Sequence, residues 1–229
     1  MQPYYEQDGI TIYHGDSRAI LPALEDGLVD VTITDAPFNT AQGTSGTVME
    51  YGIATNESRP WDMYVEWLLG IITECERVST GPVLCFVSKR GLFHMITRRH
   101  PWWLGQWVAS GQSTGSPAGP KNGVMFQPSY EPCLFYGNRY SVKACIQDAW
   151  QYPAEKTSHL GHPCAKPISL MRRLIRDLQG QTVLDPFMGS GTTLRAAKDL
   201  GRRAIGIEIE ERYCEIAAKR LAQGVLFAA

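Results

Sequence analysis

The chain lacks several features that would quickly assign it to a class of protein. Its 229 residues carry 22 Lys and Arg against 23 Asp and Glu, and a net charge of -1 gives no overall attraction to nucleic acid. A nucleic-acid partner would need basic residues gathered on one face. No apolar run is long enough to cross a bilayer, and residues 1–6 lack the basic and apolar segments of a signal peptide. We therefore expect a cytoplasmic protein that does not enter a membrane.

Metal-binding and disulfide motifs are also missing. The six cysteines include no Cys-x-x-Cys pair and no histidine at metal-ligand spacing, so we expect no metal site. Scattered cysteines of this kind are typical of free, mostly buried thiols. They are Cys75, Cys85, Cys133, Cys145, Cys164 and Cys214.

Short apolar strands alternate with amphipathic helices along most of the chain. Strands are predicted at residues 10–13, 30–34, 83–87, 102–109, 133–136, 182–184 and 204–209. Helices are predicted at residues 17–25, where Ser17 would be the cap, and at 61–78, 91–99, 167–178, from about 192, and 211–221. This alternation indicates an α/β fold.

Two short segments, far apart in the chain, each follow an apolar strand. Residues 34–38 read Thr-Asp-Ala-Pro-Phe, and residues 183–193 read Val-Leu-Asp-Pro-Phe-Met-Gly-Ser-Gly-Thr-Thr. A β-branched run stopped by an acidic residue and then Pro or Gly is typical of a buried parallel strand that ends at a functional edge. Ligands of open α/β sheets bind at that edge, so we interpret the segments as two halves of one site.

The second segment has the character of a ligand-binding turn. Its glycines allow the backbone to approach a ligand closely, and the helix that follows presents free N–H groups to an anion such as an amino-acid carboxylate. A phosphate loop is disfavoured because Thr192 stands where its lysine belongs. Glu208, at the end of the next strand, is placed to accept hydrogen bonds from ribose hydroxyls. Alone, this segment leaves open a plain tight turn followed by a surface glutamate.

With residues 162–167, His-Pro-Cys-Ala-Lys-Pro, the two segments resemble the S-adenosylmethionine-dependent amino-methyltransferases that modify adenine or cytosine in DNA. That family has an Asp-Pro-Pro-Tyr-like catalytic motif and an Asp-Pro-Phe-x-Gly-Ser-Gly-Thr-Thr cofactor motif. In its beta class the catalytic motif comes first, and His-Pro-x-x-Lys-Pro precedes the cofactor motif. The order and the spacing of the motifs and most of their residues agree here, and the resemblance spans nearly the whole chain.

The resemblance implies a Rossmann-like fold of permuted motif order, with one doubly wound, mostly parallel seven-stranded sheet and helices on both faces. It implies a single domain, residues 1–229. The catalytic half would cover about 1–137, a short recognition or connecting segment about 138–161, and the cofactor half about 162–229.

The resemblance also implies how S-adenosylmethionine is held. Asp185 and the 187–191 loop would hold the methionine part, Glu208 the ribose, and Asp16 the adenine amino group. Lys166 would lie near the methionine carboxylate, although a capping turn with a solvated lysine is the alternative for that segment. The predicted cofactor set is Asp16, Asp35, His162, Lys166, Asp185, Pro186, Phe187, Gly189, Ser190, Gly191, Thr192 and Glu208.

Asp35, Ala36, Pro37 and Phe38 are the implied catalytic residues. The Asp35 carboxylate and the Ala36 carbonyl would each accept one N–H of the target amino group, which localises its lone pair and stabilises the positive charge of methyl transfer. Phe38 would stack on a flipped-out base. Ala36 replaces the usual Pro, and Phe38 replaces the commoner Tyr.

The acidic first residue of the catalytic motif resembles the adenine enzymes more than the cytosine ones. We therefore expect methylation of the 6-amino group of adenine in DNA. Methylation of the cytosine 4-amino group shares almost every feature and remains open. So do an RNA or protein substrate and a non-catalytic relative that binds cofactor or DNA.

DNA is the expected partner. The candidate contacts are Lys89, Arg90, Lys121 and Arg59. Arg59 and Lys121 fall in residues 39–60 and 112–127, two Gly-, Ser- and Asn-rich stretches that predict either functional loops or disordered insertions. So short a recognition segment favours a short or relaxed target sequence, or recognition shared across a homodimer.

Overall fold

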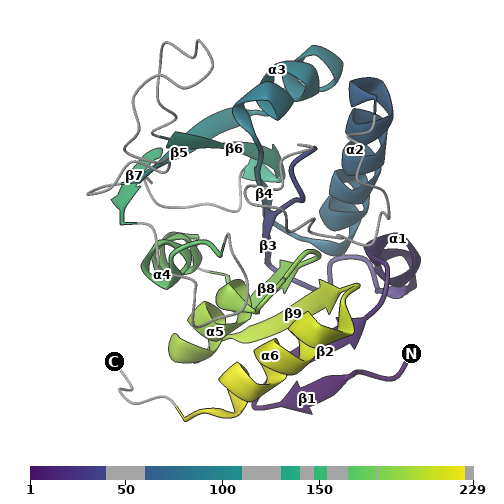
Figure 1. Cartoon of the computed structure of the whole chain (residues 1–229), viewed down its shortest axis with the longest axis vertical. Coiled ribbons are helices and arrows are strands. Elements are labelled where there is room, and N and C mark those ends of the chain that lie inside the picture. The colour runs from purple at the N-terminus through teal and green to yellow at the C-terminus, as the bar shows by residue number, and fades with distance from the viewer. Residues whose placement is uncertain (40–59, 110–129, 140–146, 154–164, 179, 225–229) are drawn as a thin grey trace, which may run out of the picture.

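The computed structural model describes residues 1–39, 60–109, 130–139, 147–153, 165–178 and 180–224 (Figure 1). In these residues nine strands form one sheet, in the order β1-β2-β9-β8-β3-β4-β6-β5-β7. The strands are β1 (Tyr5–Gln7), β2 (Ile10–His14), β3 (Val31–Asp35), β4 (Pro82–Phe86), β5 (Trp103–Ala109), β6 (Tyr130–Gly137), β7 (Ala149–Tyr152), β8 (Thr182–Asp185) and β9 (Arg203–Glu208).

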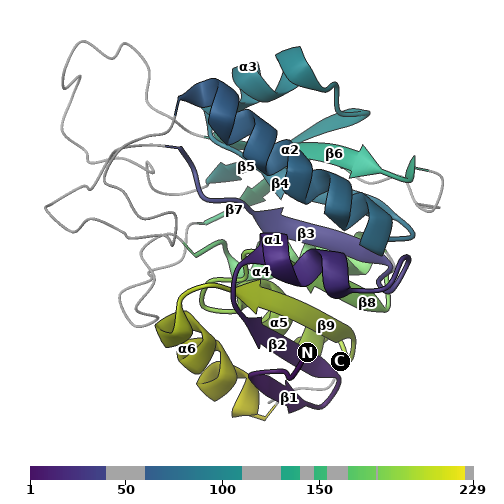
Figure 2. The ribbon, with the colours of Figure 1, turned by 90° about the vertical axis from the view of Figure 1, so that its right-hand side faces the viewer.

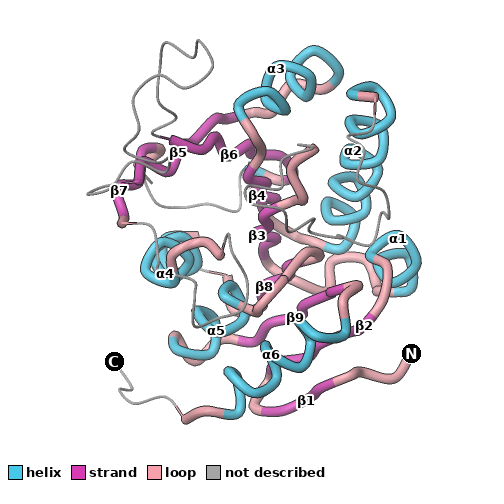
Figure 3. Tube along the Cα trace, in the orientation of Figure 1, coloured by secondary structure: helices cyan, strands magenta, loops and turns pink. Residues whose placement is uncertain are grey.

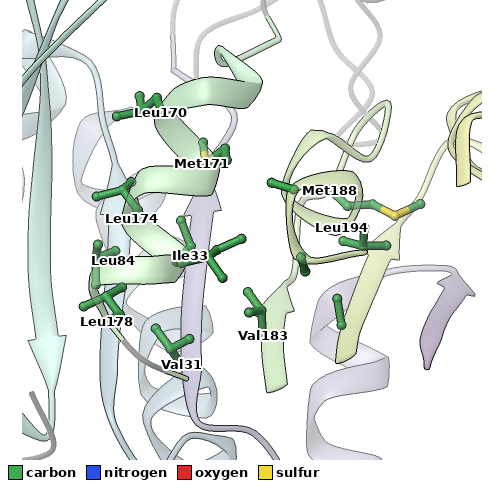
Figure 4. Close-up of a cluster of buried hydrophobic side chains, with 14 of the residues drawn as sticks. Val31, Ile33, Leu84, Leu170, Met171, Leu174, Leu178, Val183, Met188 and Leu194 are labelled. Atoms are coloured by element: carbon green, nitrogen blue, oxygen red, sulfur yellow. The ribbon is translucent and has the colours of Figure 1, made fainter. Parts of the chain in front are cut away.

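Helices cover both faces of this sheet, as Figure 3 shows. They are α1 (Ser17–Ile20) with the 3₁₀ turn η1 (Leu21–Ala23), α2 (Trp61–Val78), α3 (Lys89–Arg98), α4 (Ile168–Asp177), α5 (Thr192–Asp199) and α6 (Glu211–Ala222). One buried cluster takes side chains from α1, α2 and α3, and the other takes them from α4, α5 and α6. In the second cluster, Leu170 and Leu174 of α4 pack over Ile33 of β3 (Figure 4).

The α/β class, the Rossmann-like sheet and all seven predicted strands are confirmed, but the strand count is wrong by two. The extra strands, β1 and β7, are three and four residues long and lie at the two edges of the sheet. Such short segments offer too few alternations for a clear strand pattern. β7 falls within the predicted connecting segment, residues 138–161.

The predicted helix at residues 17–25 needs a correction. It is a single turn of α-helix continued by the 3₁₀ turn η1, and its cap is Asp16 rather than Ser17. The Asp16 carboxylate accepts a hydrogen bond from the Arg18 N–H at 2.8 Å, whereas the Ser17 hydroxyl donates to the Pro186 carbonyl at 2.5 Å. Pro22 lies within the 3₁₀ turn, where its missing N–H interrupts the α-helical pattern.

The strand order brings the two halves of the chain together. β2, β9, β8, β3 and β4 run parallel, with β8 of the predicted cofactor half paired to β3 of the predicted catalytic half. Figure 2 shows these strands stacked through the molecule, with the helices packed around them. The carboxyl ends of β3, β8 and β9 therefore meet at one edge.

Two other predictions concern single features. No helix within the described ranges has the length and apolar character needed to span a bilayer. Cys75, Cys85, Cys133 and Cys214 are buried thiols. The other two cysteines and most of the predicted loops 39–60 and 112–127 lie outside the described residues.

Candidate active site

The two sequence segments meet at the carboxyl ends of β3 and β8. The Thr34 hydroxyl donates a hydrogen bond to Asp185 Oδ1 at 2.9 Å, and both side chains are buried. Thr34 directly precedes Asp35, so this bond joins the two segments through adjacent strands. The structure thus brings together the residues that the sequence analysis assigned to one site.

The segment that follows β3 is held by a helix. Ala36 is buried, and the Tyr64 hydroxyl of α2 donates to the Pro37 carbonyl at 2.9 Å. From the sequence, Tyr64 was predicted only as part of the helix at residues 61–78. A helical period does not show which acceptor a buried hydroxyl bonds to, so this hydrogen bond could be found only from the tertiary structure.

The two carboxylate oxygens of Asp35 have different surroundings. Oδ2 lies 2.5 Å from Lys166 Nζ, whereas Oδ1 is buried and has no hydrogen-bond partner among the described residues. Burial raises the pKa of Asp35 to about 6, against the opposing effect of the Lys166 ammonium. Above that pH, Oδ1 is an unused acceptor on a charged group at the edge of the sheet.

Lys166 forms ion pairs with two carboxylates of the chain. Its ammonium lies between Asp35 Oδ2 and Glu131 Oε2, 2.9 Å from the latter, and its side chain is only 5% exposed. Burial opposes the charge, but the two carboxylates together raise the pKa of Lys166, so it remains an ammonium. A buried ammonium needs anionic partners. Those partners here are the carboxylates of Asp35 and Glu131.

Glu131 is a site residue that the sequence analysis missed. It lies in β6, directly before the predicted strand at residues 133–136. Because β6 runs antiparallel to β4, its first residues reach the edge at which β4 ends. An acidic residue beside the buried strand is a local signal, but it does not show which cation lies opposite.

The glycine loop between β8 and α5 adopts a conformation that depends on glycine. Gly191 caps α5 with φ of 78°, and a Cβ there would lie 2.8 Å from the Cβ of Ala217. The Gly189 N–H donates to Glu208 Oε2 at 2.9 Å. Glu208 therefore fixes the loop from the end of the neighbouring strand β9.

Asp185 and Glu208 are both buried carboxylates. Burial raises the pKa of Asp185 to about 6 and also raises the pKa of Glu208. Glu208 Oε1 accepts the Glu210 N–H at 2.9 Å, so each of its oxygens holds one backbone group. A carboxylate accepts about four hydrogen bonds, which leaves capacity for hydroxyls of a ligand.

Other predicted cofactor residues surround the same loop. Ser190 and Thr192 are buried, Phe187 lies against Trp67 with ring centroids 5.5 Å apart, and the Pro186 carbonyl accepts the Ser17 hydroxyl. Asp16 does not bond to this loop through its carboxylate, whose partner within the described ranges is Arg18. Its carboxylate pairs with Arg18 at 2.5 Å, and that side chain lowers the pKa of Asp16.

The predicted DNA contacts are only partly described. Lys89 Nζ lies 3.9 Å from the ring centroid of Tyr130, and the Arg90 guanidinium lies 5.4 Å from that of Trp61. Both cations belong to the start of α3, and each lies over an aromatic ring of another element. Arg59, Lys121 and His162 lie outside the described residues.

Comparison with known proteins identifies the family. Residues 29–219 match the sequence model of N6_N4_Mtase, described as DNA methylase. The chain belongs to this DNA methylase family. Its relatives include the type II methyltransferase M.ScaI of Streptomyces caespitosus, 28% identical, with the alignment covering 96% of the present chain and 84% of M.ScaI. The DNA adenine methyltransferase YhdJ of Escherichia coli K12 is 27% identical, covering 92% and 82%.

Solved structures share the architecture of this DNA methylase. The cytosine-N4-specific PvuII DNA methyltransferase superposes with a TM-score of 0.73 at 19% identity, covering 99% of the present chain and 91% of that enzyme. The M1.HpyAVI–SAM complex gives a TM-score of 0.61 at 25% identity, covering 92% and 99%.

The cofactor of this DNA methylase is S-adenosylmethionine, as for the amino-methyltransferases of its family. The described residues fit that molecule. Asp185 and Glu208 offer carboxylate acceptors for an ammonium and for hydroxyls, and the glycine loop opens the start of α5 to a carboxylate.

Proposed function

We propose that this DNA methylase transfers a methyl group from S-adenosylmethionine to the 6-amino group of adenine, with the base flipped out of the duplex. The observation that carries the proposal is the buried Oδ1 of Asp35, which has no partner in the part of the chain that the structure describes and lies at the edge where β3 and β8 end. A buried acceptor without a partner is costly unless a ligand satisfies it. An exocyclic amino group is a donor of the right kind.

The chemistry follows from the properties of that amino group. Its lone pair is delocalised into the base, so the nitrogen is a poor nucleophile until both N–H groups are held. Asp35 Oδ1 accepts one N–H and the Ala36 carbonyl accepts the other, which favours a tetrahedral nitrogen. The Asp35 charge also stabilises the positive charge that develops on the nitrogen.

The rest of the catalytic segment supports this role. The Tyr64 hydroxyl restrains the Pro37 carbonyl, which offsets the backbone freedom that Ala36 introduces in place of proline. Phe38 supplies the aromatic face for the extruded base. Its ring centroid lies 5.4 Å from Lys166 Nζ, so the stacking face lies beside the cluster that contains Asp35.

S-adenosylmethionine supplies an activated methyl group on a sulfonium when it is bound. In this proposal, Asp185 and the 187–191 loop hold its methionine part, Glu208 holds the ribose and Asp16 faces the adenine. His162 and Lys166 belong to the same proposed set, although Lys166 acts from the side of Asp35. Residues 1–229 then form a single methyltransferase domain.

Adenine is favoured over cytosine by two observations. The first motif residue is acidic, as in the adenine enzymes that the sequence resembles, and YhdJ is named a DNA adenine methyltransferase. The second candidate is transfer to the cytosine 4-amino group. That reaction would use the same two acceptors, Asp35 and Ala36. The PvuII enzyme is cytosine-N4-specific, but at 19% identity its likeness concerns the fold alone.

Nucleoside analysis tests the proposed base directly. The protein is incubated with labelled S-adenosylmethionine and mixed-sequence DNA, the DNA is digested, and the nucleosides are separated by mass. We expect the label in 6-methyladenine. Label in 4-methylcytosine would replace adenine by cytosine, and cofactor binding without any label would favour a non-catalytic relative or an RNA substrate.

Lys89 and Arg90 are proposed DNA contacts at the start of α3, and Arg59 and Lys121, which lie outside the described residues, belong to the same proposed set. Phosphate contacts make affinity depend on salt. Alanine at both Lys89 and Arg90 should weaken DNA binding and flatten its salt dependence, measured by fluorescence anisotropy. An unchanged salt slope would remove them from the interface.

A homodimer is also proposed, and sedimentation velocity tests it.

A further inference from the structure

The ion pairs that Lys166 forms with Asp35 and Glu131 have no role in the chemistry proposed above. Lys166 bridges Asp35 in β3 and Glu131 in β6, with N–O distances of 2.5 Å and 2.9 Å. Two of the three side chains are only partly exposed, at 27% for Asp35 and 29% for Glu131, and Lys166 is almost completely buried. Burying three charges is expensive, so the cluster is not explained by stability alone.

The charges of the cluster suit the reaction. An Asp35–Lys166 pair by itself would be neutral, and the ammonium would cancel much of the negative charge that favours a developing cation on the amino nitrogen. Glu131 adds a second negative charge on the far side of Lys166. The three ionised groups then sum to -1.

The two oxygens of Asp35 have different partners. Lys166 contacts Oδ2 and leaves Oδ1 without a partner. The ammonium lies 5.4 Å from the Phe38 ring centroid and 5.3 Å from that of Phe86, so aromatic faces surround it. An ammonium enclosed in this way, with carboxylates on two sides, holds the orientation of Asp35.

We propose that Glu131 is a positioning residue for methyl transfer, which acts through Lys166 to keep Asp35 oriented and the cluster negatively charged. This inference rests on the function proposed above. It assigns a purpose to a glutamate that touches neither the target base nor S-adenosylmethionine in that proposal. Lys166 is the group through which Glu131 acts.

The remaining titratable neighbours of Asp35 do not compete for this role. Tyr64 of α2, Cys85 of β4 and Cys133 of β6 lie close enough to interact with it, but burial raises the pKa of all three and they stay uncharged near neutral pH. Asp185 of β8 is the other nearby carboxyl group that ionises in this range. Lys166 and Glu131 are thus the groups whose removal should change the ionisation of Asp35 most.

Titration of the Asp35 carboxyl carbon tests the inference without relying on activity. The signal is recorded by NMR in protein labelled with carbon-13 at aspartate, and its absence from Asp35→Asn assigns it. Glu131→Gln should lower the pKa of Asp35, because a like charge is lost, and Lys166→Met should raise it, because an opposite charge is lost. Glu66→Gln, at an exposed position of α2, is the matched control and should change neither the titration nor the rate.

The kinetic consequence separates positioning from simple ionisation. Glu131→Gln should lower kcat about tenfold, although its Asp35 ionises more readily, because the remaining Asp35–Lys166 pair is neutral. Binding of S-adenosylmethionine, measured by calorimetry, should stay within about twofold. Glu131→Asp keeps the charge and should recover most of the rate.

Each result has a distinct meaning. An unchanged Asp35 titration in Glu131→Gln and Lys166→Met, or shifts in the same direction, would overturn the inference. So would wild-type kcat in Glu131→Gln. If Glu131→Gln fails to fold, judged by circular dichroism, the comparison of Lys166→Met and Glu131→Asp with wild type decides the question. A wild type without transfer activity would overturn the proposed function, while the titration would still decide whether Glu131 and Lys166 control Asp35.

Discussion

The side chains around Asp35 divide its two oxygens between structure and chemistry. Oδ2 is held by Lys166, and Oδ1 remains a buried acceptor. Protonation near pH 6 would turn the acceptor carboxylate into a neutral acid, so the proposed reaction should slow as the pH falls through that value. Burial of Asp35 thus leaves Oδ1 open to a donor of the ligand, and it also sets the pH range in which the carboxylate is charged.

Tyr64→Phe is the sharpest test of the restraint on the catalytic segment. The variant keeps the buried ring but loses the hydroxyl that donates to the Pro37 carbonyl at 2.9 Å. We expect a loss of about 1 kcal/mol in unfolding free energy and a several-fold lower kcat. Denaturant titration and transfer kinetics measure the two effects, with S-adenosylmethionine binding unchanged. A wild-type kcat would show that the hydroxyl does not position the segment.

At the scale of the elements, the end of β8 predicts an unusual pH dependence. Asp185 has a pKa of about 6 in the folded protein against 3.8 as the ordinary value. A raised folded pKa contributes stability that is fully present below the unfolded value and is lost as the pH rises through the folded value. Wild-type stability should therefore fall, relative to Asp185→Asn, between about pH 4 and pH 6.

The expected fall in wild-type stability relative to Asp185→Asn is up to about 3 kcal/mol, because each pKa unit corresponds to about 1.36 kcal/mol. Chemical denaturation of both proteins at several pH values measures it. Glu66→Gln serves as the control at an exposed site of α2. A stability difference between wild type and Asp185→Asn that stays constant from pH 4 to pH 7 would contradict the account.

The elements also show which parts of the structure the sequence could predict. The bounds of α2 were predicted at both ends, and β3, β8 and β9 within a residue or two, because apolar periodicity and the residues that stop it are local signals. Short edge strands give little local signal, which is why β1 and β7 were missed. The rule that ligands bind at strand ends predicted that the ends of β3 and β8 share one edge, but not that the two strands are paired neighbours.

The ion cluster shows where prediction from sequence stops. Asp35, Glu131 and Lys166 come from three separate segments, and only the folded sheet brings them within reach of one another. The family resemblance placed Lys166 in the site but assigned it to the cofactor. A buried cation and its partners depend on tertiary packing, which residue patterns do not encode.

At the scale of the whole molecule, one sheet connects the predicted catalytic and cofactor halves. β3 of the first half lies between β8 of the second half and β4 of the first (Figure 1). Thr34 and Asp185 add a side-chain link across this junction. A ligand bound at the common edge should therefore stabilise the folded chain as a unit.

Thermal unfolding with S-adenosylmethionine tests that expectation. A ligand that binds only the folded state at 100 times its Kd stabilises it by about 2.7 kcal/mol, so Tm should rise with ligand concentration. Asp185→Ala should show little rise, whereas Asp35→Ala should respond like wild type. A Tm that does not depend on S-adenosylmethionine in wild type would contradict the cofactor assignment.

The most direct test of the central claim, that the β3 and β8 strand ends form one methyl-transfer site, is transfer of labelled methyl to DNA by wild type, Asp35→Ala and Asp185→Ala, with S-adenosylmethionine binding measured on the same samples. The account predicts that Asp35→Ala binds the cofactor and transfers nothing detectable, and that Asp185→Ala loses cofactor binding first. Wild-type transfer rates in Asp35→Ala would contradict it.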